Sequence, residues 1–158
     1  MKLIAHKGNT DGPNPATENH PEQVEKCIEA GYDVEVDLWY DQDGKLWLGH
    51  KEPQYEVTWW WLAGKAEHLW IHCKDFPTLH EFTTNTSGYN YFWHQTDDYA
   101  LTSKNIMWAY PGKIHGPNTV IIMKEPPSPL ADVKSEDDYV CYGICSDYVG
   151  RIDIEWDT

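Results

Sequence analysis

The sequence predicts an α/β fold in which parallel strands alternate with helices and loops. Residues 2–39 read as strand, loop, helix and strand, and acids alternate with apolar residues over residues 32–39. Polar residues also end most of the predicted strands, namely His6, Glu35, Asp37, His72, Lys74, His94 and Asp147. This combination is typical of a parallel barrel or of an open doubly wound sheet.

The composition is acidic and rich in large aromatic rings. The 158 residues carry a formal net charge of −14, with 9 Trp and 10 Tyr against 3 Phe. A chain of this length is expected to form one domain over residues 1–158. The negative charge argues against nucleic acid as a general partner, and an anionic substrate would need a metal ion or a local basic cluster.

The sequence shows neither a signal-peptide pattern nor a membrane-spanning segment, so we expect a cytoplasmic protein. In that compartment Cys27, Cys73, Cys141 and Cys145 would stay reduced and act as small buried apolar residues. Cys141 and Cys145 have the spacing of half a zinc site, but no second pair completes it.

The first β-α-β unit follows from turn residues and apolar spacing. We predict a strand over residues 2–6, a loop over residues 9–18, and a helix that begins at residues 19–22 and ends at Gly31. The acidic strand, residues 32–39, follows at once. This order implies a parallel pair of strands joined by a right-handed crossover.

The later elements are predicted to be short. A turn at residues 41–44 leads into an antiparallel strand over residues 45–50. A loop over 51–57, a helix over 58–67, a strand over 69–74 and a helix over 77–84 follow. Further strands are predicted over residues 91–94, 106–110, 119–123 and 139–147, a loop or short helix over 126–138, and a small edge over 151–158. At least one of the three adjacent tryptophans at residues 59–61 should be exposed.

Alternation along the acidic strand sorts its side chains into two faces. Asp33, Glu35 and Asp37 share one face because strand side chains alternate with a period of two. Asp33 lies too early to reach the C-terminal end and is predicted to be structural. In a barrel, the opposite face would pack on helices, together with matching residues of neighbouring strands: Leu3, Ala5, Val34, Val36, Ile71 and Cys73.

Glu35 and Asp37 are predicted to bind one divalent metal ion. Their carboxylate oxygens suit Mg²⁺ or Ca²⁺. If His72 completes the site, its nitrogen favours Mn²⁺, Zn²⁺ or Fe²⁺. An ion pair with a nearby lysine is the alternative explanation for the two acids.

Four motifs occur in order within the first 50 residues. They are Ile4-Ala5-His6-Lys7-Gly8, Thr17-Glu18-Asn19-His20, Gly31-Tyr32-Asp33-Val34-Glu35-Val36-Asp37, and Asp43-Gly44 followed by Gly49-His50. In order and spacing they resemble the glycerophosphodiester phosphodiesterase family, one of the phosphatidylinositol-phospholipase-like barrels. Residues 69–74 and 142–147 resemble later family motifs more weakly.

The resemblance implies a shortened TIM-type (β/α) barrel with parallel strands and reduced or missing helices. It implies metal-dependent hydrolysis of a small or glycan-linked phosphodiester, in lipid or glycan phosphate metabolism, with one divalent ion as cofactor. The attacking oxygen would be a neighbouring hydroxyl of the substrate, which gives a cyclic phosphate that can then be hydrolysed. Mg²⁺ or Ca²⁺ is the first expectation for the ion, and Mn²⁺ or Zn²⁺ the second.

The resemblance also implies which residues form the site: a general acid and base, phosphate-binding cations and metal ligands. His6 and His50 would be the general acid and base. Lys7 and Lys74 would bind the phosphate, and Glu35, Asp37 and His72 would bind the metal ion.

Four departures distinguish the chain from the family pattern. Lys7 stands where the family has an arginine, which keeps the charge but loses the planar fork. His72 stands where a third acidic ligand is expected, and Lys51 follows His50 where an aspartate is usual. The chain is also short for a full barrel. These departures bear on the metal and the substrate more than on the location of the site.

Two other functions remain open from the sequence. A non-catalytic barrel could hold a sugar phosphate with the rings of Trp39, Trp47, Trp93 and Trp108. A lyase or isomerase could instead form a Schiff base through Lys74, because barrels host such lysines at strand ends.

Overall fold

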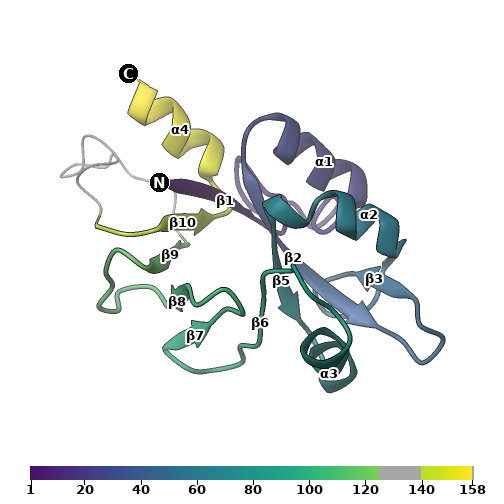
Figure 1. Cartoon of the computed structure of the whole chain (residues 1–158). Coiled ribbons are helices and arrows are strands. Elements are labelled where there is room, and N and C mark those ends of the chain that lie inside the picture. Colours follow the sequence, from purple (N-terminus) through teal and green to yellow (C-terminus); the bar gives the residue numbers. More distant parts are fainter. Residues whose placement is uncertain (125–139, 158) are drawn as a thin grey trace.

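A computed structural model describes residues 1–124 and 140–157, and it contains a mostly parallel sheet (Figure 1). Seven strands pair in parallel in the order β6-β5-β2-β1-β10-β9-β8. In chain order their bounds are β1 Lys2–His6, β2 Asp33–Tyr40, β5 Leu69–Cys73, β6 Tyr91–Phe92, β8 Met107–Ala109, β9 Thr119–Met123 and β10 Gly143–Ser146. The α/β class and the parallel pairing of the first two strands are therefore confirmed.

Three antiparallel strands extend this sheet. Strands β3 (Leu46–Leu48) and β4 (Tyr55–Val57) form a meander on the C-terminal half of β2. Strand β7 (Tyr99–Leu101) pairs with β8. The antiparallel return after β2 is predicted, whereas β4 and β7 are not, because residues 51–57 are assigned to a loop and no strand is assigned to residues 99–101.

The two ends of the parallel order approach each other around one apolar interior. The Phe92 ring on β6 stacks on the Trp108 ring on β8 with centroids 5.0 Å apart. Both belong to a buried cluster with Ile4, Trp70 and Cys145, which come from β1, β5 and β10. A sheet whose end strands share one core with its middle strands is curved, as in a barrel, and is not a flat doubly wound sheet.

The curved sheet is not closed by hydrogen-bonded strands. No ladder joins β6 to β7 or β8 among the described residues. Ser103 spans this gap, since its backbone N–H donates to Tyr91 O at 2.8 Å and its hydroxyl donates to Tyr89 O at 2.9 Å. The predicted shortened (β/α) barrel is thus seen as an open, mostly parallel sheet that curves around a core.

Within residues 1–124 and 140–157, four α-helices and one 3₁₀ helix accompany the strands: α1 Pro21–Glu29, α2 Trp59–Gly64, α3 Phe76–Thr84, α4 Val149–Asp157 and the 3₁₀ turn Ala66–His68. The side chains of His20, Thr58 and Asp75 cap the first three helices. Of the predicted outward face, Ala5, Val34, Val36, Ile71 and Cys73 lie in the core cluster that contains Val24, Leu62 and Phe82 of these helices, and the partly buried Leu3 packs against it. That prediction is confirmed.

Two other predictions need correction or lie outside the described residues. The tail over residues 151–158 was expected to add a sheet edge, but residues 149–157 form α4, in which Ile152 is buried. The predicted loop or short helix at residues 126–138 falls in the range that the structure does not describe. Among the three adjacent tryptophans, Trp60 is 88% exposed, as expected.

All four cysteines are free thiols, and three of them are buried. Burial raises the pKa of Cys27 to about 11 and that of Cys73 to about 12. The pKa of Cys145 is raised well above its ordinary value by burial and by the carboxylates of Glu35 and Asp147. These three buried cysteines therefore behave as apolar residues. In the described part of the chain, no helix has the length and apolar character needed to cross a membrane.

Candidate active site

A cavity of about 560 Å³ opens at the C-terminal ends of the parallel strands. The residues expected to form the site from the sequence all line it: His6, Lys7, Glu35, Asp37, His50, His72 and Lys74. The opposite wall comes from β6, β8 and β9 and contains Phe92, Trp93, His94, Trp108, Tyr110 and Lys124. The two halves thus differ, one being rich in charge and the other in aromatic rings.

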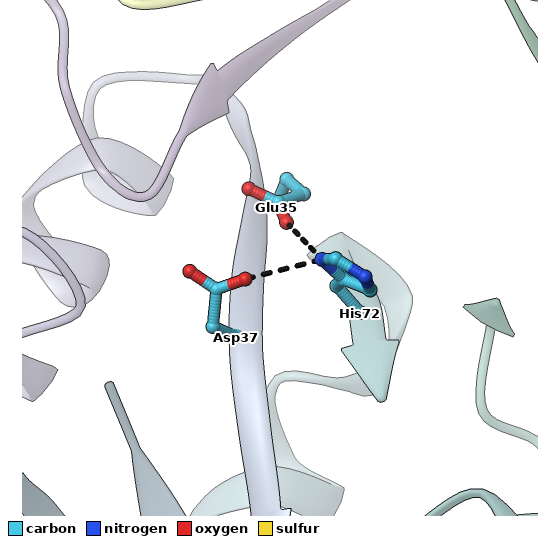
Figure 2. Close-up of side chains that lie close together, drawn as sticks. All are labelled: Glu35, Asp37 and His72. Atoms are coloured by element: carbon cyan, nitrogen blue, oxygen red, sulfur yellow. Dashed lines mark ion pairs between the residues drawn. The ribbon is translucent and has the colours of Figure 1, made fainter. Parts of the chain in front are cut away.

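Glu35, Asp37 and His72 point toward one another at the base of the charged half (Figure 2). His72 Nδ1 lies 3.8 Å from Glu35 Oε1 and 3.2 Å from Asp37 Oδ1. One donor atom from each residue can be chosen so that all three lie within 4.8 Å of one another. Parallel pairing of β2 with β5 sets this geometry, because Asp37 is the register partner of His72.

Glu35 is a buried acid with an unused oxygen. The residue is 3% exposed, and its Oε2 accepts no hydrogen bond from any described residue. Burial and the neighbouring Asp37 carboxylate raise the pKa of Glu35, against the opposing effect of His6, His72 and Lys7. A buried acceptor without a partner costs free energy, so this oxygen fits a site that a cation completes.

Asp37 is held from several sides. Asn19 Nδ2 donates to its Oδ2 at 3.0 Å, and His50 Nδ1 lies 3.1 Å from the same oxygen. Burial would raise the pKa of Asp37, but the hydrogen bond from His50, the adjacent His72 ring and the charge of Lys74 outweigh it and lower the pKa below its usual range. Asp37 is therefore a carboxylate, and its Oδ1 faces His72.

The His72 ring is fixed in orientation. Its Nε2 lies 3.1 Å from the backbone oxygen of His94, and the ring stacks on Phe92 at an interplanar angle of 7°. Burial lowers the pKa of His72, but Asp37 and Glu35 outweigh burial and raise it. The ring edge that carries Nδ1 thus faces the two carboxylates.

His6 is oriented by Asp147 on β10's C-terminal side. His6 Nδ1 lies 2.9 Å from Asp147 Oδ1, and Asn9 Nδ2 donates to the same oxygen at 2.8 Å. His6 Nε2 is left 3.7 Å from Glu35 Oε2. Burial opposes protonation of His6, but Asp147 and Glu35 together raise its pKa.

His50 is presented by the loop after β3. A side chain at position 49 would clash with Glu52 O, so glycine is required there. Gly49 N donates to Asp37 O at 3.1 Å, and Trp39 Nε1 donates to Gly49 O at 2.7 Å. These bonds hold the His50 Nδ1 edge against Asp37 and leave the other ring nitrogen available.

The two lysines already have carboxylate partners. Lys7 Nζ lies 3.3 Å from Glu18 Oε2, and Lys74 Nζ lies 3.7 Å from Asp37 Oδ1. Both side chains are largely buried, with 12% and 17% exposed. They line the cavity, so each can contact a ligand while keeping its partner.

Sequence reasoning did not identify several residues that support this cluster. Asn9 and Asn19 were treated as loop or cap residues, although both are buried and bonded to site acids. Asp147 ends a predicted strand but is not among the predicted site residues. Their place in the sequence could have identified them as site residues, since each lies in or beside one of the motifs described above. Trp39 and Trp47 lie on the β2–β3 pair and are not among the cavity-lining residues.

Asp33 lies at the other end of the sheet, as predicted. Its carboxylate is 3.2 Å from Lys2 Nζ and accepts a hydrogen bond from Trp70 Nε1 at 3.0 Å. The third acid of the strand is therefore structural.

We expect Asn19→Ala to lower the free energy of unfolding by about 2–4 kcal/mol, measured by urea denaturation. Asn19 has φ of 61° and exchanges two 3.0 Å hydrogen bonds with Asp37, one of them from the Asp37 backbone N–H. The exposed Asn105, with φ of 60°, provides a matched control for backbone strain alone. A loss in Asn19→Ala no larger than in Asn105→Ala would contradict this role.

The comparisons with known proteins bear on the fold. No protein-family model matches the chain, and no curated protein matches it. Among solved structures, it is similar to a provisionally assigned glycerophosphodiester phosphodiesterase from Galdieria sulphuraria, with a TM-score of 0.55 and 12% identity over 98% of this chain and 97% of that one. A glycerophosphoryl diester phosphodiesterase from Parabacteroides distasonis gives a TM-score of 0.47 and 13% identity over 98% of this chain and 85% of that one. At such identity, the first similarity shows a shared fold.

Proposed function

We propose, from the fold shared with a glycerophosphodiester phosphodiesterase, that this chain is a metal-dependent phosphodiester hydrolase. One observation carries the proposal: a Glu–Asp–His cluster and two acid-bound histidines line a single cavity. Each of these features occurs alone in structural roles. Together they supply a cation site and two proton-transfer groups, which phosphodiester cleavage requires.

The residues present fit a divalent ion. The donor set would be Glu35, Asp37 and His72, and the unpartnered Glu35 Oε2 is the atom that most needs a cation. A bound ion would polarise a phosphoryl oxygen and stabilise negative charge that develops in the transition state. It would also offset the two buried carboxylates against which an anionic substrate must bind.

His6 and His50 would carry the protons. A carboxylate only accepts hydrogen bonds, so Nδ1 of each ring bears hydrogen toward Asp147 or Asp37. In the neutral rings, Nε2 is then the basic nitrogen. One histidine would take the proton of the attacking oxygen and the other would protonate the departing oxygen.

The attacking oxygen would come from the substrate. Cys73 and Cys145 line the cavity, but their raised pKa values keep them as thiols near neutral pH, so neither is an effective nucleophile. In the proposed reaction a neighbouring hydroxyl forms a new P–O bond while the P–O bond to the leaving alcohol breaks. The hydroxyl proton passes to one histidine, the other gives its proton to the alcohol, and a cyclic phosphate results. Water would then form a new P–O bond while one ring P–O bond breaks, with the two histidines in reversed roles, which completes the hydrolysis to a phosphomonoester.

The two ester arms would lie on different walls. Lys7 and Lys74 would contact the phosphate beside Glu35 and Asp37. The far wall offers the Trp93 ring, which is 36% exposed, and the His94 and Tyr110 rings, which stack with centroids 5.5 Å apart. Such ring faces suit the C–H surface of a sugar or another ring. A small or glycan-linked phosphodiester fits this arrangement.

The proposal is tested with a nitrophenyl phosphodiester whose alkyl arm carries a neighbouring hydroxyl. We expect release of nitrophenolate, lost by at least about 100-fold after chelation and restored by a divalent ion. The matched propyl ester without the hydroxyl should not react. No release with any of Mg²⁺, Ca²⁺, Mn²⁺ or Zn²⁺ would refute the proposal.

Two further measurements test the other two functions. Binding of a sugar phosphate without turnover would indicate a non-catalytic binding module. Lys7 and Lys74 could contact such a phosphate while each keeps its carboxylate partner. Trapping of a carbonyl substrate on Lys74 by borohydride would indicate a Schiff base. The ion pair of Lys74 Nζ with Asp37 argues against this function, because it favours the charged amine.

A further inference from the structure

His72 presents one particular nitrogen to the two acids. A carbonyl oxygen can only accept a hydrogen bond, so the 3.1 Å contact from His72 Nε2 to His94 O requires hydrogen on Nε2. In the neutral ring Nδ1 then carries the lone pair. Metal-binding histidines are typically fixed in this way, with the second nitrogen donating to a carbonyl or carboxylate.

The ring has little freedom to turn away from the acids. Phe92 stacks on it at 5.0 Å between centroids, and the side chain is 18% exposed. Rotation of the ring would break the bond to His94 O and lose this stacking. His72 therefore offers a preorganised nitrogen donor, which differs from a surface histidine that happens to lie near acids.

The carboxylates offer few further oxygens. Asp37 Oδ2 is engaged by Asn19 Nδ2 and His50 Nδ1, which leaves Oδ1 for a metal ion. Glu35 contributes Oε2, which accepts no hydrogen bond from the described residues, or Oε1. Asp37 Oδ1 also lies 3.7 Å from Lys74 Nζ, which offsets part of the negative charge that attracts a cation.

This donor set matches some divalent ions better than others. Ca²⁺ requires six to eight oxygen ligands, and Mg²⁺ is held mainly by charged oxygens and retained waters. An imidazole nitrogen with two carboxylate oxygens suits Mn²⁺, Fe²⁺ or Zn²⁺. We propose that His72 makes this site selective for such transition ions over Mg²⁺ and Ca²⁺, an inference that rests on the proposed function.

The test measures binding and needs no turnover. Titration calorimetry gives the affinities of the metal-free protein for Mn²⁺ and Mg²⁺. Because Mn²⁺ binds many sites more tightly than Mg²⁺, the diagnostic quantity is the ratio of the two affinities in wild type against His72→Glu. We expect the Mn²⁺ to Mg²⁺ ratio to fall by at least about 10-fold in His72→Glu. His115→Glu, at an exposed position outside the cavity, provides the matched charge control and should keep the wild-type ratio.

A spectroscopic measurement identifies the nitrogen directly. Pulsed electron paramagnetic resonance of the Mn²⁺-loaded protein should show coupling to one imidazole nitrogen, which His72→Glu abolishes and His115→Glu retains. An unchanged affinity ratio in His72→Glu, or absence of nitrogen coupling in wild type, would overturn the selectivity. If either of these results is found but the protein turns over substrate with Mg²⁺, the proposed phosphodiester cleavage still stands. Failure to bind any ion would overturn both.

Discussion

Replacement of Glu35 by glutamine is expected to lower kcat/KM for the hydroxyl-bearing phosphodiester by at least about 1,000-fold. The variant keeps the shape of the side chain but loses the charge on the buried residue whose Oε2 has no hydrogen-bond partner. Binding of a divalent ion, followed by calorimetry, should weaken by a similar factor. The measurement therefore links the loss of activity to the loss of the cation.

The stability of the same variant provides an independent check. The raised pKa of Glu35 means that its ionisation costs folding free energy; this cost begins as the pH rises above the unfolded-state pKa and is complete above the folded-state pKa. Without metal, Glu35→Gln should therefore unfold at the same or a higher urea concentration than wild type. Glu29→Gln, at an exposed position at the end of α1, is the charge-matched control. Full activity in Glu35→Gln would refute the metal-dependent reaction.

His6→Ala is expected to reduce kcat by about 100- to 10,000-fold, with a smaller change in KM. The ring would act in proton transfer, and the Asp147 carboxylate orients it at 2.9 Å. Asp147→Asn should cause a smaller loss, because the ring remains and only its positioning weakens. Stopped assays at saturating substrate, with metal content measured in each sample, separate this effect from loss of the ion.

Two substrates distinguish the roles of the histidines. A nitrophenolate departs without protonation, so removal of the general acid should slow an alkyl leaving group far more than a nitrophenyl one. Removal of the general base should slow both equally. The exposed His115, replaced by alanine, serves as the control. Unchanged turnover of both substrates in His6→Ala would show that this histidine takes no part.

The sequence predicted much of the strand framework because local signals there are strong. The acids over residues 32–39 alternate, the helix over Pro21–Glu29 has a capping residue and a proline in its first turn, and Gly31 follows it. The short strands β4 and β7 escaped prediction, since their own residues carry no clear strand pattern and pairing with a neighbouring strand stabilises them. The C-terminal helix escaped because Val149 and Ile152 are buried against β1 and β10, which a local pattern does not reveal.

Within the site, the sequence by itself determined the residue types and the level at which they stand. Alternation puts Glu35 and Asp37 on one face, and motif order places His6 and His50 near them. The tertiary structure decided what each atom does. Register between β2 and β5 sets His72 against Asp37, β10 brings Asp147 to His6, and the His94 carbonyl orients the His72 ring. These contacts join residues distant in the chain, and a hydrogen bond depends on distances of a few tenths of an ångström that only packing of the whole sheet fixes.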